Sequence, residues 1–504
     1  MTGVVHVSTP ADLGIREVRQ IADGACVVLA PDLLSRLAMS REQTLAALDQ
    51  GLPVYGVTTG MGLQSNLAVG ADDAAYQGDL MLARAVGTEP WLDRRTTRAV
   101  IATRLRTLLD PEAGISPALA TALADLLDTD SHPAVPEGDN GAVGEIIPLA
   151  HLGGFLTGRG EGIGADGALE PAAELLRSAG LTPYEFAAKE GVAFLQGIPV
   201  AAAQAVLLND DARLLAAQSL AVAAAEVAVV RAPRDPYDAA LARGDHLLGD
   251  VLTSLRDLAG DEPNPRMLQA PVSFRVVGPA LAHLLRSIDH LGDSTERALT
   301  GVSTSPALLD GRFLGTAGFD GFDLAATMDA ARVAVLHVAD VGAARLHRML
   351  DPRVSGLNAQ LSAAPGRQAG LVAVHKRVVG RLHAVRRAAA PASLGATETS
   401  LGQEDVQSFA LESAHALHES LLALRDGVAC ELLAVHQAHL LDDTGPRGSE
   451  SLQAVLHKAS EGLGDDPADR PFGRDVAALT HVLGVGWAHD VLTVTRDAPS
   501  RHPR

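Results

Sequence analysis

Apolar residues recur at helical spacing through most of the second half of the chain. Residues 323–350 carry them three or four positions apart, beginning with Leu324 and Met328. Residues 407–440 hold no proline and a single glycine, and residues 214–230 form the longest apolar run. Stripes this apolar need burial against other helices, so the pattern predicts long helices packed as a bundle.

The first 200 residues differ, because short helical segments alternate there with glycine-rich loops. Residues 54–62 and 135–148 are two such loops, and their glycines permit backbone conformations that other residues resist. A break at residues 442–448 ends the bundle. We therefore expect an N-terminal domain over residues 1–200, a central helix bundle over 201–440, and a C-terminal helical segment and tail over 441–504.

Composition narrows the class of protein. Aromatic residues make up only 3% of the 504 residues, which favours closely packed helices over a β-sandwich. The net charge of −20 argues against nucleic-acid binding, because phosphate contacts need clustered Lys and Arg. Cys26 and Cys430 form neither a disulfide framework nor a metal motif, and no signal peptide or membrane span is evident. We expect a soluble, cytoplasmic protein with no membrane partner and no metal site.

One loop carries most of the functional information. Residues 135–151 read VPEGDNGAVGEIIPLAH, and they resemble the signature loop of the histidine/phenylalanine ammonia-lyase family. In that family an Ala-Ser-Gly tripeptide cyclises and dehydrates into methylidene-imidazolone (MIO), the electrophile that activates the amino acid. Here the tripeptide is Ala142, Val143 and Gly144, and valine has no β-hydroxyl to lose as water. We therefore expect no MIO and no other cofactor.

The resemblance implies roles for two residues near this loop. Residues 54–60, VYGVTTG, resemble the family's YGVNTG loop, whose tyrosine is the catalytic base, and Tyr55 matches that tyrosine. A phenol is a poor base unless cationic neighbours favour its ionised form. Residues 187–197 resemble AAKEGLALLNG, with Gln196 in place of an asparagine that supports the cofactor. The plainer alternatives are that Tyr55 plugs a glycine-rich turn and that Gln196 is a core residue.

Two arginines are candidate anion clamps. Residues 269–275, QAPVSFR, resemble the family's QDxYSxR, whose arginine grips the substrate carboxylate, so Arg275 keeps that position and Val272 replaces its tyrosine. Arginine suits this role because its fork donates two parallel hydrogen bonds. Arg84 replaces a histidine that lines the side-chain end of the substrate, and a second cation suits a carboxyl-bearing molecule. A solvated surface arginine is the alternative for Arg275.

Further pocket positions also differ from the family pattern. Phe319 and Asp320 lie where the family has NFHG, so Asp320 replaces a pocket histidine. Glu404 lies in GQED, which resembles NQED, and matches a carboxylate that contributes to acid/base work in histidine lyases. Ser305 replaces an asparagine that supports the cofactor. Val143, Gln196 and Ser305 therefore changed together, which indicates a repurposed pocket.

The resemblance implies a mainly α, aromatic amino acid lyase-like fold, related to fumarase and aspartase. It has a long central helix bundle and a smaller mixed N-terminal domain. It also implies a homotetramer whose active sites each draw on three chains, so Tyr55, Val143 and Arg275 would meet only in the assembly. The partner at each site would be a small-molecule substrate.

Three functions are compatible with these residues. The first is an enzyme without a cofactor that moves protons on a carboxyl- or carbonyl-bearing small molecule, in an elimination, conjugate addition or cyclisation. Its expected setting is specialised biosynthesis. Tyr55 would be its base, Arg275 and Arg84 its anion clamps, and Asp320 or Glu404 its acid. The second is an inactive homologue that binds a small molecule or a partner subunit. The third is an ammonia lyase with an altered electrophile, which the hydrocarbon side chain of Val143 disfavours.

Overall fold

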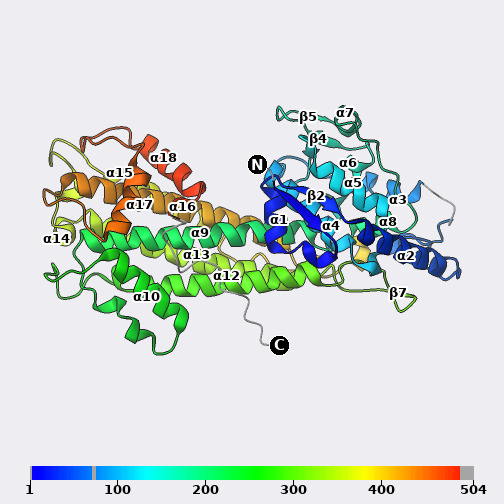
Figure 1. Cartoon of the computed structure of the whole chain (residues 1–504), viewed down its shortest axis with the longest axis horizontal. Helices are drawn as coiled ribbons and strands as arrows, with labels where there is room; N and C mark the ends of the chain where they lie inside the picture. The colour runs from blue at the N-terminus through cyan, green and yellow to red at the C-terminus, as the bar shows by residue number, and fades with distance from the viewer. Residues whose placement is uncertain (1–2, 71–74, 489–504) are drawn as a thin grey trace. The chain divides into compact units, whose positions relative to one another are not determined.

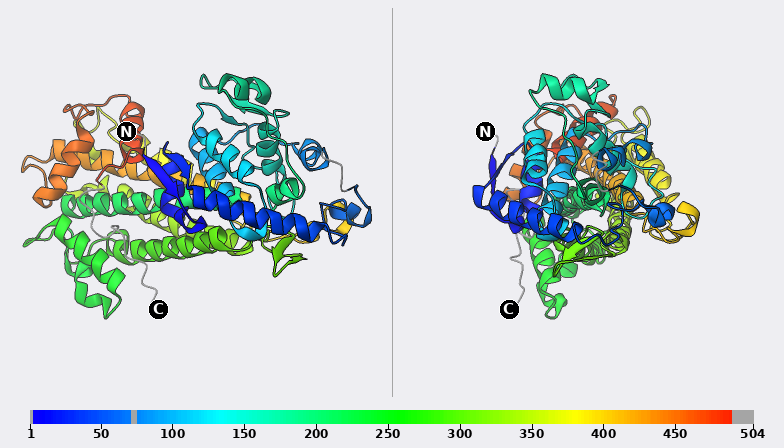
Figure 2. Two further views of the ribbon diagram at one scale, coloured as in Figure 1. Left: turned by 45° about the vertical axis from the view of Figure 1, so that its right-hand side comes forward. Right: turned by 90° about the vertical axis from the view of Figure 1, so that its right-hand side faces the viewer.

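The structure, a computed structural model, describes residues 3–70 and 75–488. It is mainly helical, as predicted (Figures 1 and 2). The sequence predicted domains at 1–200, 201–440 and 441–504, whereas the compact units each combine three separate segments, because the chain returns twice to the first unit. The first unit holds Met1–Leu208, Leu291–Asp329 and Pro391–His415. The second holds Asn209–His290, Ala330–Ala390 and Ala416–Arg504.

The first unit is built around α4 (Arg94–Leu108), whose residues from Thr97 to Leu108 are all buried. The helix begins where the Asp93 side chain accepts a hydrogen bond from the Thr96 N–H, an ordinary N-cap. Helices α1 and α5 pack against α4. The helices that lie wholly in this unit are α1 (Ile15–Ala22), α2 (Pro31–Leu48), α3 (Tyr76–Asp79), α4, α5 (Pro117–Leu127), α6 (Ile146–Leu156), α7 (Ala172–Ser178) and α8 (Glu190–Leu195).

Strands in the first unit are short and occur in three small sheets. Strands β1 (Val4–Val7) and β2 (Cys26–Leu29) pair in parallel, with Val4 opposite Cys26. The second sheet has the order β3-β4-β5 and is antiparallel: β3 (His132–Pro133), β4 (Glu161–Ile163) and β5 (Leu169–Pro171). The third is an antiparallel hairpin of β6 (Ala307–Leu309) and β7 (Arg312–Leu314). Such small sheets support loops, and the helices carry the core.

The second unit contains the long apolar helices that the sequence predicted. Helices α13 (Phe322–Met349) and α16 (Ala410–Leu441) match the predicted stripes closely. The unit boundaries fall within these two helices and within α9 (Pro199–Val229) and α12 (Val277–Thr300). The shorter helices of this unit are α10 (His246–Ala259), α11 (Val272–Arg275), α14 (Pro352–Ser355), α15 (Val372–Arg386), α17 (Glu450–Ser460) and α18 (Gly473–Gly484).

A buried ionic triad joins three helices inside the second unit. Arg345 of α13 donates to Glu226 of α9 and to Glu431 of α16, at 2.5 Å in each case, and all three side chains are at most 3% exposed. Burial, together with the neighbouring Glu431, raises the pKa of Glu226 well above its ordinary value. The triad is part of the helix core and is closed to solvent.

One apolar stretch among the described residues, 190–229, is long and apolar enough to cross a membrane. Its most apolar window is 94% buried inside the structure, however. Burial of that kind is typical of a core helix, as the sequence predicted for residues 214–230.

Candidate active site

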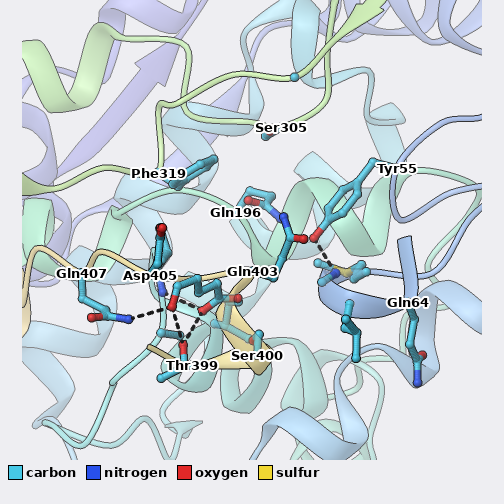
Figure 3. A pocket seen from close by; sticks show the side chains of 18 of the residues that line it. Tyr55, Gln64, Gln196, Ser305, Phe319, Thr399, Ser400, Gln403, Asp405 and Gln407 are labelled. Carbon is cyan, nitrogen blue, oxygen red and sulfur yellow. Dashed lines mark hydrogen bonds between the residues drawn. The ribbon is translucent and has the colours of Figure 1, made fainter. Parts of the chain in front are cut away.

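A cavity of about 1540 Å³ lies within the first unit (Figure 3). Six parts of the chain line it: residues 53–64, 83–84, 141–147, Gln196, 305–322, and 399–407. Figure 3 shows the side chains of Tyr55, Gln196 and Phe319 together with the loop that carries Thr399, Gln403 and Asp405. The cavity therefore combines residues that are hundreds of positions apart in the sequence.

Tyr55 enters the cavity from a tightly held turn. Gly56 has a φ of +69°, and an added Cβ would come within 2.6 Å of the Val192 side chain, so glycine is required there. The Gln77 side chain ties this turn to α8, because it donates to the Gly56 carbonyl and accepts from the Val192 N–H. The Tyr55 hydroxyl oxygen accepts a hydrogen bond from the Gly62 N–H at 2.8 Å. That bond leaves the hydroxyl proton itself free for another acceptor.

The loop around Val143 forms the floor of the cavity. Gly144 has a φ of +74°, and an added Cβ would lie 3.2 Å from the Gly197 carbonyl oxygen. Asn140 closes the turn by donating to the Gly144 carbonyl at 2.7 Å. The Val143 N–H donates to Oε2 of Glu404 at 3.1 Å, across 261 positions of sequence. This hydrogen bond joins the signature loop directly to the candidate acid/base carboxylate.

Glu404 is presented by a small hairpin. Thr399 and Glu404 exchange backbone hydrogen bonds, and the Thr399 hydroxyl also donates to Oε2 of Glu404 at 3.3 Å. Gln407 is 3% exposed, and its amide binds both the N–H and the carbonyl of Thr397, which fixes the base of the hairpin. Glu404 itself is only half-buried, so its carboxylate is held firmly and still reaches the cavity.

A buried charged pair lies beneath the signature loop. Glu145 is 2% exposed and accepts hydrogen bonds from the Val200 and Ala201 N–H groups, which caps the first turn of α9. Arg104 is fully buried and donates to the carbonyls of Ala193 and Gln196. Burial raises the pKa of Glu145 to about 8 and lowers the pKa of Arg104 to about 9. Together they fix the backbone on either side of the cavity floor.

Four other predicted residues also line the cavity. Arg84 donates to the Leu80 carbonyl at 2.9 Å through one of its nitrogens, which leaves the rest of the guanidinium for a ligand. Asp320 accepts from the Phe322 N–H at the start of α13, so part of its role is to cap that helix. Gln196 is 9% exposed, and Phe319 is half-buried.

Arg275 and Val272 are not among the residues that line this cavity. Both belong to α11 in the second unit, where Val272 is 59% exposed. Nε of Arg275 is buried without a hydrogen-bond partner in the described part of the chain. Tyr55 and Val143 line one cavity within a single chain, and Arg275 does not line it. That all three residues meet in an oligomer stays a prediction.

Sequence reasoning missed the residues that hold the site together. Thr399 and Gln407 lie five positions before and three positions after Glu404, and only their bonds in the folded loop reveal their roles. The sequence did not indicate a supporting role for Arg104, because α4 has a polar sequence although nearly all of its residues are buried in the structure. Among residues 3–70 and 75–488, no group of three or more His, Cys, Asp or Glu side chains is arranged to hold a metal ion.

A mainly helical chain with a glycine-rich loop and a tyrosine turn at one cavity has the architecture of the ammonia-lyase and aminomutase class. Solved structures share this fold over 96% of the chain. The ergothionase of Treponema denticola is 20% identical, with a TM-score of 0.89 over 99% of that chain. The tyrosine aminomutase of Streptomyces globisporus is 24% identical, with a TM-score of 0.88 over 97% of that chain.

The chain belongs to the aromatic amino acid lyase family, whose sequence profile matches residues 13–461. It is similar to the histidine ammonia-lyase of Geobacillus sp. (strain WCH70), with 28% identity over 97% of this chain and 98% of that protein. The histidine ammonia-lyase of Bacillus anthracis (strain A0248) is 26% identical over 94% of this chain and 96% of its own length. The family resemblance and the lyase-like fold predicted from the sequence are confirmed.

Proposed function

We propose that this protein is an enzyme that moves protons on a carboxyl- or carbonyl-bearing small molecule without the family's MIO cofactor. The observation that carries the proposal is the arrangement of Tyr55 and Glu404. Both line one cavity around Val143, and each has an oxygen held by a backbone N–H. Two groups that can exchange protons, fixed at one cavity, are the elements of general acid–base catalysis.

The residues at the signature loop do not fit the cofactor. Its formation needs a β-hydroxyl that leaves as water, and the side chain at position 143 is hydrocarbon. Gln196 and Ser305 stand at two further positions that support the cofactor in the family, and the Ser305 hydroxyl is instead bound to Thr316. We therefore expect no release of ammonia from histidine or phenylalanine, because their β-proton is barely acidic without the electrophile.

The proposed chemistry uses a substrate that activates its own proton. A carbonyl or carboxyl group beside the reacting carbon acidifies the C–H bond, and Arg84 would bind that group. In an elimination, Tyr55 as its phenolate would accept the proton, the C–H electron pair would form the new double bond, and Glu404 or Asp320 as its carboxylic acid would protonate the leaving group. In a cyclisation, a nucleophile within the substrate would instead add to a double bond that the substrate already carries beside its carbonyl group. Tyr55 would take the proton of the nucleophile and Glu404 or Asp320 would protonate the carbon beside the carbonyl, so the product would keep the substrate's mass.

We also propose a soluble homotetramer. Apolar side chains are exposed at the cavity lining, with Leu401 at 85% and Val406 at 65%, and exposed apolar surface of this kind is typical of interfaces. Nε of Arg275 is buried and has no hydrogen-bond partner among the residues that the structure describes, which supports an anion-binding role for that side chain at an active site shared between copies.

Untargeted mass spectrometry of extract from the producing cell tests the proposal. Extract is incubated with the wild-type protein, with Tyr55→Phe, and with Tyr76→Phe, whose hydroxyl contacts the same loop but does not line the cavity. We expect the wild type and Tyr76→Phe to convert a small molecule, and Tyr55→Phe to be slower by about 10²–10⁴-fold. Loss of ammonia or water in the product indicates a lyase, and unchanged mass with a new retention time indicates a cyclase or isomerase.

The alternative is an inactive homologue that binds a small molecule or a partner subunit. Identical metabolite profiles with wild type and Tyr55→Phe across several extracts and pH values would favour that alternative and contradict the proposed enzyme.

A further inference from the structure

The two oxygens of the Glu404 carboxylate have different surroundings. Oε2 accepts the Val143 N–H at 3.1 Å and the Thr399 hydroxyl at 3.3 Å, and that hydroxyl also lies 3.4 Å from the Glu404 carbonyl oxygen. Within the described part of the chain, Oε1 has no hydrogen-bond partner, although Glu404 lines the cavity. One oxygen is therefore anchored, and the other is available to a bound molecule.

Hydrogen bonds within the hairpin that carries Glu404 maintain this difference between the two carboxylate oxygens. Ser400 and Leu401, at the turn, have φ values of 51° and 55°, which residues other than glycine rarely adopt. Such conformations persist only where surrounding bonds enforce them. Here the Thr399–Glu404 bridge and the bond from Gln407 to the Glu404 carbonyl supply those bonds.

The Val143 N–H can donate a hydrogen bond only while the peptide backbone of residues 142–144 is uncyclised. Closing the tripeptide into a five-membered imidazolone ring turns the nitrogen of its middle residue into an imine, which has no hydrogen to donate. The bond from the Val143 N–H to Glu404 therefore requires an uncyclised loop. In this chain the same atoms that would form the family's cofactor instead hold the carboxylate.

We infer that Thr399 is a positioning residue that, with the Val143 N–H, fixes Oε2 of Glu404 and leaves Oε1 to exchange a proton with the substrate. The inference rests on the proposed function and refines the role of Glu404 within it. Hydrogen bonds to one oxygen of a carboxylate make its two carbon–oxygen bonds unequal. Removing one of the two donors to Oε2 therefore makes the two carbon–oxygen bonds of Glu404 more alike. The only bond made or broken at Glu404 is the one between Oε1 and that proton.

The infrared stretching bands of the Glu404 carboxylate test this directly and need no substrate. The protein is labelled with carbon-13 at the glutamate side-chain carboxyl groups, and Glu404→Gln identifies the Glu404 bands by their loss. We expect the antisymmetric and symmetric stretching bands to lie closer together in Thr399→Val than in the wild type, because the two carbon–oxygen bonds become more alike. Thr399→Ser keeps the hydroxyl and Val143→Ala keeps the backbone N–H, so both should keep the wild-type separation of the two bands.

Equal band separations in Thr399→Val and wild type would overturn the inference. An equal change in Thr399→Val and Thr399→Ser would also overturn it, because it would indicate a general disturbance of the hairpin. With the substrate found in extract, we expect turnover to fall in Thr399→Val and to be kept in Thr399→Ser. A changed band separation in Thr399→Val with no Tyr55-dependent conversion would sink the proposed function and leave the Thr399 contact intact, so the two failures are distinguishable.

Discussion

Charged groups occupy two contrasting environments in this protein. In the second unit, Arg345 binds Glu226 and Glu431 in a triad that is at most 3% exposed and leaves no oxygen accessible to a ligand. At the cavity of the first unit, Glu404 is half-buried, with one oxygen anchored and the other open. The carboxylates of the triad only hold helices together, whereas the carboxylate at the cavity has one oxygen open to a bound molecule. Under the proposed function, one accessible, well-positioned oxygen is therefore a better guide to chemistry than a strongly shifted pKa.

Removing the cation of the triad should produce the largest loss of stability. Arg345→Met leaves two carboxylates buried without a partner, and breaking a buried pair in this way costs about 3–5 kcal/mol in the free energy of unfolding. Urea denaturation measures this loss. Any Arg345→Met protein that stays folded should keep its turnover, because the triad does not line the cavity.

An exposed ion pair provides the matched control. Arg297 and Asp323 form a pair whose side chains are 60% and 62% exposed, and Arg297→Ala should cost less than about 1 kcal/mol. If the two variants lost similar stability, the contrast between buried and exposed charges would not hold in this protein.

Glu145 sharpens the comparison, because it is a buried carboxylate close to the cavity floor. Its pKa rises from 4.5 to about 8 on folding, since burial disfavours the charged form. Between these pH values the folded state binds more protons than the unfolded state, so this group lowers stability as pH rises from about 4.5 to about 8. The side chain in Glu145→Gln cannot ionise, so this variant does not lose stability in that way as pH rises.

Unfolding free energies of the wild type and Glu145→Gln, measured from pH 4 to pH 9, check this sign. We expect the wild type to fall progressively relative to the variant between about pH 4.5 and pH 8, and the difference to be flat above that window. A difference that stays constant across the window would show that Glu145 is ionised throughout and is a simple charged cap of α9.

The candidate site could be predicted well where a local motif carried it. The glycines of residues 54–62 and 135–148 predicted tight turns, and both turns contribute to the cavity. The resemblance brought Tyr55, Val143 and Glu404 into one proposed pocket, and the structure brings these residues together at one cavity. Local backbone requirements are visible in a sequence, because glycine is nearly obligatory at a left-handed position.

The supporting contacts could not be predicted, because they join distant segments. The bond from Val143 to Glu404 spans 261 positions, and nothing in either segment specifies the other. Arg104 lies on α4, whose polar sequence indicates an exposed helix, yet its guanidinium is buried against two backbone carbonyls. The compact units could not be predicted for the same reason, since each of them combines three separate segments of the chain.

The most direct test of the central claim is the intact mass of the protein that performs the Tyr55-dependent conversion. We expect the active, purified wild type to have the mass that its sequence encodes, with residues 142–144 uncyclised and no absorbance from an MIO group. An active fraction whose mass is lower by at least one water molecule, the loss that ring closure at residues 142–144 requires, would contradict the account, because the signature loop would then have cyclised despite Val143.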